Sequence, residues 1–366
     1  MKSPNQKIIE KLRRNFPAMA GLVVIGLSVL IAVFAYVIVP DNTPNANEQF
    51  PSLALQAPGF SVQMLVLKKE NQNHTSFLKG IFSGKERNYE LIPIQTCEST
   101  NNEYITITKY NPFNESGIKE TISANAVFKK NGVTLIKNRT FLLGTDNLGR
   151  DVFSRLIVGA RVSLIVGFIA VLVATLVGIF IGSIAGFYRG WVDKLVMWKL
   201  SVFWSIPTLL LAMALYIGLK DFFASSYLII ITAIGLTMWV EMARVVRGQI
   251  FALREIQFVE AAHSLGFSDF RVMFKHIVPN LIGPIIVIVA SNFANAILIE
   301  AGLSFLGLGI QPPSPSWGGM LSEFKDMVGT NLSYLAIFPG FLIMVLVLSF
   351  NLVGNGLRDA IDIKRN

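Results

Sequence analysis

The amino-acid sequence predicts an all-α polytopic membrane protein with six transmembrane helices and an extracytoplasmic β-rich insertion between helices 1 and 2. The first observation is composition. The 366 residues are 52% hydrophobic and 15% charged, with a mean hydropathy of +0.55, which is too apolar for an ordinary soluble protein. The second is length, because six apolar runs reach the ~20 residues that a helix needs to cross a bilayer. The third is the alternation of apolar and polar residues after the first run, which is typical of strands.

The apolar runs divide the chain into four parts. The runs cover residues 16–39, 162–188, 200–219, 222–240, 277–299 and 335–353. The predicted parts are residues 1–40 with the first helix, the insertion 41–155, a membrane core 156–357 with a polar loop at 243–276, and a tail 358–366. Pro207 and Pro284 fall inside the third and fifth runs, where they imply kinks or local unwinding.

The distribution of basic residues predicts the orientation of the helices. The net charge of +9 would suit a nucleic-acid-binding protein, but no basic stripe with interleaved aromatic residues is present. Lysine and arginine instead gather before the first run, in the loop 243–276 and at the end of the chain, whereas the short loops on the other side hold only Lys220 and Lys325. This asymmetry places both termini and the loop 243–276 in the cytoplasm, and the first run is interpreted as an uncleaved signal anchor.

The residue types that build metal or redox sites are sparse. Cys97 is the only cysteine, so an intramolecular disulfide is impossible. The three histidines, His74, His263 and His276, lie in different segments, so we expect no metal site. The segment 144–151 has the look of a calcium loop, but Leu148 stands where an oxygen ligand is needed. A turn with a helix-capping Asp is the simpler interpretation.

The insertion shows strand and hairpin patterns. Apolar residues alternate along 62–66 and along 105–108. Two further apolar segments, 127–130 and 133–136, flank Asn131-Gly132, a pair that favours a two-residue hairpin turn.

A polar segment at 260–280 interrupts the apolar part of the chain. Residues 258–265 are predicted to form a short helix that ends at Gly266 in a left-handed conformation. A second helix can begin at Ser268 or Asp269, because both are good N-cap residues. Ala261 and Ala262 would leave the helix surface nearly bare, so that another protein could approach its backbone closely. This predicts a docking element.

Two motifs carry a resemblance to a known family. Glu260-Ala261-Ala262, followed by Gly266 and by Ile277-Val278-Pro279-Asn280, resembles the EAA loop of the membrane subunits of ABC importers. Gly144-Thr145-Asp146-Asn147-Leu148-Gly149-Arg150-Asp151, followed by Ala160-Arg161-Val162-Ser163-Leu164, resembles the segment before the core of dipeptide and oligopeptide permeases, C-type subunit. The resemblance covers about 141–359 and leaves most of the insertion unmatched.

The resemblance implies a type I ABC importer fold and a function. The chain would be the permease subunit of an ATP-driven peptide importer in the plasma membrane of a prokaryote. Its partners would be a second permease subunit, two cytoplasmic ATP-binding subunits and an extracytoplasmic solute-binding protein. The residues that would couple it to the ATPase subunits are Glu260, Ala261, Ala262, Gly266 and Pro279. Relatives of this type also carry other solutes, such as nickel chelates, so that alternative stays open.

No catalytic residues are predicted. The nearest match to a phosphate-binding loop, Gly84-Lys85-Glu86, lacks the hydroxyl residue that would hold magnesium. We therefore expect no enzyme and no cofactor in this chain, with ATP and magnesium bound by partner subunits. The alternatives from other classes are an ion-coupled secondary transporter, which would need paired acids or broken helices at the midplane and an inverted repeat, and a membrane-anchored receptor or enzyme.

Some residues within the runs are candidates for a path or for packing. Glu241 lies at the inner end of the fourth run, where it can pair locally with Arg244 and Arg247 or line a polar path. Glu300 ends the fifth run, where it should reach the outer water layer or face a cavity, because an unpaired acid in a membrane is costly. A small residue recurs every four positions at Gly178, Gly182 and Gly186, which favours close helix packing.

Overall fold

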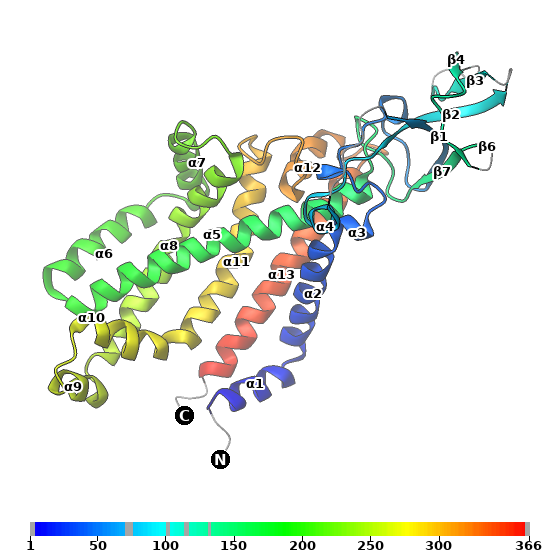
Figure 1. Ribbon diagram of the computed structural model, residues 1–366. Helices are drawn as coiled ribbons and strands as arrows, with labels where there is room; N and C mark the ends of the chain where they lie inside the picture. Colours follow the sequence, from blue (N-terminus) through cyan, green and yellow to red (C-terminus); the bar gives the residue numbers. More distant parts are fainter. Residues whose placement is uncertain (1–3, 70–75, 100–102, 113–116, 131–132, 363–366) are drawn as a thin grey trace.

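The chain forms a bundle of long helices with a small β-rich part at one end. The computed structural model describes residues 4–69, 76–99, 103–112, 117–130 and 133–362. In Figure 1 both ends of the described chain lie at the lower side of the bundle, near helix α1, whereas the strands stand off the opposite side. The sheet has apolar clusters of its own, whereas the segment around Ala46 and Leu55 packs against the bundle helices.

The helices of the bundle follow the predicted runs with changed boundaries. They are α1 (Pro4–Arg14), α2 (Phe16–Val33), α3 (Ala35–Ile38), α5 (Val152–Tyr188), α6 (Gly190–Trp204), α7 (Thr208–Leu219), α8 (Ser226–Leu253), α9 (Gln257–Ser264), α10 (Asp269–Arg271), α11 (Ile282–Phe305), α12 (Trp317–Phe324) and α13 (Tyr334–Asp362). Among the described residues, five helices are long and apolar enough to cross a membrane, or six spans if the bent pair α6 and α7 counts as one. The predicted fold class is confirmed.

The third predicted span is broken. Helices α6 and α7 meet at 96°, and the residues between them include Pro207. Proline has no backbone N–H and clashes with the preceding turn of a helix, which explains why helix α6 does not continue. The prediction of a single straight helix over 200–219 is therefore wrong, although a kink or local unwinding at Pro207 was predicted.

Several helices extend past the predicted boundaries. Helix α5 begins at Val152, inside the segment assigned to the insertion, and its 37 residues correspond to roughly 55 Å. Helix α8 continues through Glu241 to Leu253, so the fourth span does not end at 240. Helix α13 continues to Asp362, so residues 358–362 belong to it. Hydropathy marks the apolar part of each helix and cannot mark where the helix continues into water.

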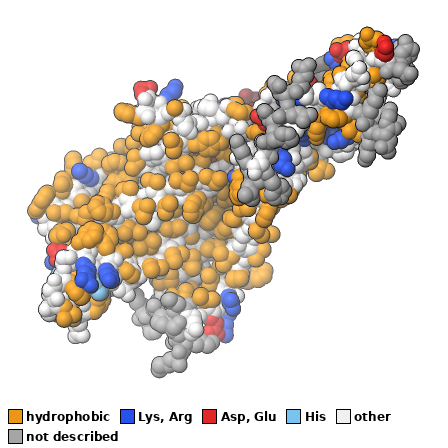
Figure 2. Space-filling view, in the orientation of Figure 1, with side chains coloured by type: hydrophobic (Ala, Val, Ile, Leu, Met, Phe, Trp, Pro, Cys, Tyr) orange, Lys and Arg blue, Asp and Glu red, His pale blue; other side chains and the backbone are white. Residues whose placement is uncertain are grey.

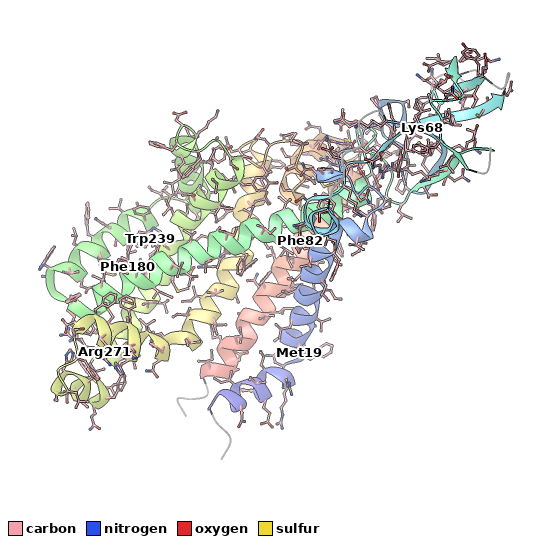
Figure 3. All side chains as sticks on the ribbon, in the orientation of Figure 1. Met19, Lys68, Phe82, Phe180, Trp239 and Arg271 are labelled. Carbon is pink, nitrogen blue, oxygen red and sulfur yellow. The ribbon has the colours of Figure 1, made fainter. Side chains whose placement is uncertain are left out.

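Close packing of helices α5 and α8 holds the centre of the bundle together. A Cβ atom added at Gly178 would lie 2.6 Å from Cβ of Met242, and one at Gly186 would lie 2.7 Å from the carbonyl oxygen of Arg247. At Gly182 it would overlap the carbonyl oxygen of Ala243. These contacts agree with the close packing expected of the three glycines, and Figure 3 places Phe180 of α5 and Trp239 of α8 along the same pair of helices.

We expect Gly182→Leu to lower the amount of protein in the membrane strongly, because the side chain would force α5 and α8 apart. The matched control is Gly26→Leu on α2, where an added Cβ would meet nothing within 4 Å. Immunoblots of membrane fractions measure both. Equal levels of the two variants would contradict the packing role.

The insertion is an antiparallel sheet with strand order β4-β3-β2-β1-β7. Its elements are β1 (Phe60–Lys68), α4 (Phe77–Ser83), β2 (Tyr89–Ser99), β3 (Tyr104–Lys109), β4 (Ile118–Ser123) and β7 (Ile136–Phe141), with a small pair β5 (Lys129–Lys130) and β6 (Val133–Thr134) and short 3-10 turns at Pro44–Ala46 and Pro51–Leu53. The predicted strands at 62–66 and 105–108 are confirmed, and β5 and β6 pair as the hairpin pattern requires. The turn Asn131-Gly132 lies outside the described residues.

The surface of the bundle matches a membrane environment. Figure 2 shows hydrophobic side chains over the middle of the helical part, with charged side chains gathered toward its upper and lower margins. Exposed apolar residues such as Leu30, Phe168 and Leu348 belong to this belt. A soluble protein rarely exposes so extended an apolar surface.

Candidate functional site

The loop between helices α8 and α11 forms a compact helical unit. Helix α9 ends at Gly266, whose φ of +78° is left-handed. The amides of Gly266 and Phe267 donate to the carbonyl oxygens of His263 and Ala262, at 2.9 and 3.2 Å, which is the Schellman pattern of helix termination. The predicted short helix and its glycine stop are confirmed, and Ser268 is the N-cap residue of helix α10.

Helix α9 has one buried and one exposed face. Val259 and Ala262 are 1% and 5% exposed and pack in a cluster with Phe187, Val272 and Met273. Ala262 therefore does not form part of a bare surface, and that part of the prediction is wrong, because Ala262 turns toward the loop itself. The exposed face carries Phe258, Glu260, Ala261 and Leu265.

Ring contacts fix the rest of the loop. The Phe267 ring stacks on His276, with centroids 5.6 Å apart, and the guanidinium of Arg271 lies 4.1 Å from the Phe267 ring centre. Arg271 is labelled in Figure 3 beside helix α9. Pro279 is exposed in the 3-10 turn Val278–Leu281 that leads into α11. The loop thus presents helix α9 on a rigid base.

Glu300 is buried among hydroxyl groups. It is 1% exposed, and its carboxylate accepts hydrogen bonds from Ser304 at 2.9 Å and Ser163 at 3.5 Å. The prediction that it reaches water or faces a cavity is wrong, since helices α5 and α12 cover it. A Cβ added at Gly318 of α12 would lie 3.2 Å from this carboxylate. Glu300 therefore links helices α5, α11 and α12 in the interior of the bundle.

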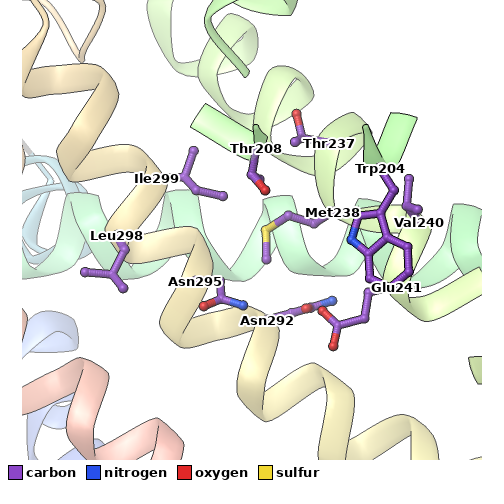
Figure 4. A pocket seen from close by; sticks show the side chains of 10 residues that line it. All are labelled: Trp204, Thr208, Thr237, Met238, Val240, Glu241, Asn292, Asn295, Leu298 and Ile299. Carbon is purple, nitrogen blue, oxygen red and sulfur yellow. The ribbon is translucent and has the colours of Figure 1, made fainter. Parts of the chain in front are cut away.

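A polar pocket of about 270 Å³ lies where the break between α6 and α7 meets helices α8 and α11. Figure 4 shows its lining side chains, which are Trp204, Thr208, Thr237, Met238, Val240, Glu241, Asn292, Asn295, Leu298 and Ile299. Glu241 is exposed in this pocket, which agrees with the polar-path interpretation. Asn292 was missed, although the two asparagines 292 and 295, one turn apart within the apolar run 277–299, are a readable signal.

The arginines near Glu241 have other partners. Arg247 forms an ion pair with Asp193 of helix α6, and the guanidinium of Arg244 stacks over the Trp204 ring at 3.2 Å from its centre. The expected local pairing with Glu241 is therefore wrong. Spacing along one helix cannot show that Asp193 of another helix approaches Arg247.

The turn 144–151 forms part of a buried polar network at the N-terminal end of α5. Asp146 is 0% exposed and accepts hydrogen bonds from the amides of Leu148 and Arg150, each at 2.9 Å. The Arg150 side chain bonds to Asp146 and reaches Glu323 of α12 at 2.6 Å. Arg155 lies 3.4 Å from each of these two carboxylates. The network ties the insertion to α5 and α12.

Asp151 occupies the N-cap position of α5, but its side chain makes no capping hydrogen bond to the backbone and accepts instead from the Ser154 hydroxyl. Burial raises the pKa of its carboxyl, and the hydrogen bond from the Ser154 hydroxyl opposes that shift. Within the described residues no group of three or more His, Cys, Asp or Glu side chains could hold a metal ion.

These features define an integral membrane transport component. Residues 178–365 match the family described as "Binding-protein-dependent transport system inner membrane component", and residues 3–58 match the "N-terminal TM domain of oligopeptide transport permease C". The chain belongs to the first of these families. It is a multi-pass permease subunit of an ABC importer, and the resemblance to the peptide-type permeases is confirmed.

Curated relatives agree with this assignment. The chain is 41% identical over 223 residues to the glutathione transport system permease protein GsiD of Pectobacterium atrosepticum, covering 61% of this chain and 72% of that protein. It is 43% identical over 222 residues to GsiD of Escherichia coli O6:K15:H31, covering 60% and 71%. A structure of the inward-facing MetNI methionine ABC transporter overlaps 57% of this chain and 97% of its own, at 17% identity and a TM-score of 0.46.

Proposed function

We propose that the chain imports short peptides, with two cytoplasmic ATPase subunits, a second permease subunit and an extracytoplasmic solute-binding protein. The relatives named for glutathione, itself a tripeptide, support this substrate class. The oligopeptide permease match at residues 3–58 supports it independently. Magnesium and ATP belong to the partner subunits, and this chain passes on the movement that hydrolysis drives.

The exposed face of helix α9 is the observation that carries the coupling role. Leu265 is 73% exposed and Phe258 is 39% exposed, and Ala261 between them leaves the backbone accessible. Exposed aromatic and aliphatic side chains on a rigid loop favour docking into a groove of another protein. Glu260, Ala261 and Gly266 would lie at this contact, and Pro279 would hold the loop to α11.

The orientation that this role requires places α9 and both termini in the cytoplasm. In Figure 1 helix α9, helix α1 and the C-terminal end of α13 all lie on the lower side of the bundle. The insertion would then face the solute-binding protein. Labelling of single-cysteine variants from outside the cell should modify the exposed position 311, near Trp317, and spare the exposed position 264, and the reverse result would overturn this orientation.

The coupling role is tested at Gly266. Gly266→Val would place a β-branched side chain at φ +78° and distort the end of α9, while nothing lies within 4 Å of the added Cβ. We expect normal amounts in the membrane and loss of peptide uptake, either with loss of ATPase copurification or with hydrolysis that no longer responds to the loaded binding protein. Gly190→Val is the matched control, because Gly190 also has positive φ and free space. Normal uptake by Gly266→Val would remove the coupling role.

Ala261→Trp is a second variant at the same contact. Because Ala261 is exposed, the indole can point away from the loop and obstruct only a partner. We expect less ATPase subunit to copurify with it.

A further inference from the structure

The pocket between α8 and α11 contains a carboxylate with no partner. Glu241 makes no hydrogen bond or ion pair with any residue that the structure describes, and it lies near the middle of the 28-residue helix α8. Glu241 stands directly after the apolar run 222–240, and ionisable side chains in membrane helices generally face a cavity or a polar path and serve transport. Glu241 is exposed in the pocket and has no partner among the described residues of this chain, so its carboxylate is available to a ligand.

Asn292 supplies a second, independent observation. Its side chain is 0% exposed, and neither Oδ1 nor Nδ2 has a hydrogen-bond partner. Buried polar groups are nearly always paired, and an unpaired one is destabilising. Figure 4 shows Asn292 of α11 and Glu241 of α8 directed toward one another across the pocket. Two unmatched groups on different helices thus share one space.

The charge of the pocket selects a cation. Glu241 is the only ionisable residue among its lining residues, and the other polar lining groups include amides and hydroxyls, all of which can accept hydrogen bonds. The nearby guanidinium of Arg244 stacks on Trp204 and forms no ion pair with Glu241 among the described residues. The lining is therefore suited to a small group with a positive charge and several N–H donors.

We propose that this pocket binds the primary ammonium group of the peptide's amino terminus as the peptide crosses the membrane. This inference rests on the proposed peptide import. An importer of short peptides meets many different side chains, and the amino terminus is the cationic group that peptides of every sequence share. The ammonium has three N–H donors, which Glu241, the Asn292 Oδ1 and a further acceptor such as Asn295 or Thr208 can receive.

The first experiment compares two substrates in proteoliposomes that contain the complete transporter. The substrates are a tripeptide with a free amino terminus and its analogue with a hydroxyl in place of the amino group, each presented on saturated binding protein. We expect the wild type to transport the free-amino tripeptide about 10 to 100 times faster, since a hydrogen bond to a charged group is lost with the analogue. Glu241→Gln should reduce this ratio to near one, and Glu241→Asp should restore part of it. Glu120→Gln, on the exposed surface of strand β4, should keep the wild-type ratio.

The outcomes separate the two hypotheses. Equal rates for both substrates in the wild type, or an unchanged ratio in Glu241→Gln, would overturn the ammonium site while leaving peptide import intact. Transport of neither substrate by the wild type would instead refute the proposed function. Loss of the second permease subunit from purified Glu241→Gln would assign Glu241 to the subunit interface and also overturn the site.

Asn292→Leu distinguishes ligand binding from a structural role. The leucine has a similar volume and removes two unpaired polar atoms, so we expect a thermal midpoint a few degrees higher. Peptide uptake should fall about 10-fold, because an acceptor for the ammonium is gone. A lower midpoint together with lower uptake, or unchanged uptake, would contradict the proposal.

Discussion

Replacing Asp146 with alanine is expected to destabilise the protein by about 3 to 5 kcal/mol, which is the usual cost of breaking a buried ion pair from one side. The Arg150 and Arg155 side chains are only 4% and 5% exposed. Without Asp146 they would share Glu323 alone, and the amides of Leu148 and Arg150 would lose their acceptor.

The measurement is thermal unfolding of the purified variant in detergent, together with its level in the membrane. We expect a thermal midpoint lower by about 10 °C, at roughly 2 to 4 °C per kcal/mol for a domain of this size class. Glu120→Ala is the control, because the Glu120 pair with Lys109 is exposed and worth at most about 1 kcal/mol. If the two variants unfolded at the same temperature, the network would have no special role in stability.

Gly149→Ala should lower the amount of protein in the membrane far more than the addition of one methyl group would suggest. Gly149 has φ +71°, and an added Cβ would overlap the carbonyl oxygen of Phe50. That carbonyl belongs to a tight backbone contact, in which the Phe50 amide also donates to the Leu148 carbonyl at 3.1 Å. We expect the variant to be nearly absent from the membrane, because the turn cannot close without moving the start of the insertion.

The control for this variant separates the cost of the positive φ from the cost of the contact between the added Cβ and Phe50. Gly59 has φ +82° but nothing within 4 Å of an added Cβ, so Gly59→Ala carries the conformational cost alone, about 1 kcal/mol. Membrane levels of Gly59→Ala should stay close to those of the wild type. Similar levels for both variants would mean that the Phe50 contact adjusts easily.

Local patterns predicted the local structure well. The positive φ of Gly266, the start of helix α10 after Ser268 and the strand at 62–66 follow from residue preferences and periodicity within a few positions. The glycine repeat in α5 also predicted close packing, because a row of missing side chains favours backbone contact with whichever helix lies beside it.

Features that depend on the approach of distant segments were not predictable. Glu300 appears at the edge of an apolar run, and only the folded chain shows that α12 covers it. Arg247 pairs with Asp193, far from it in sequence. The orientation of Ala262 depends on how helix α9 lies against Phe187, so the two alanines of the motif could not be told apart by composition.

Helix α5 connects the two ends of the molecule as a single rod. It contains no proline, it begins beside the network of Asp146 and Glu323, and it ends at Phe187, which packs against helix α9. Because its hydrogen-bonded backbone resists compression, its ends cannot shift along the axis independently. A tilt of 1° would displace one end by about 1 Å relative to the other, given a length of roughly 55 Å. Helix α5 can thus act as a lever arm. The ratio of the displacements of its two ends is set by how many residues lie on either side of its glycine contact with α8.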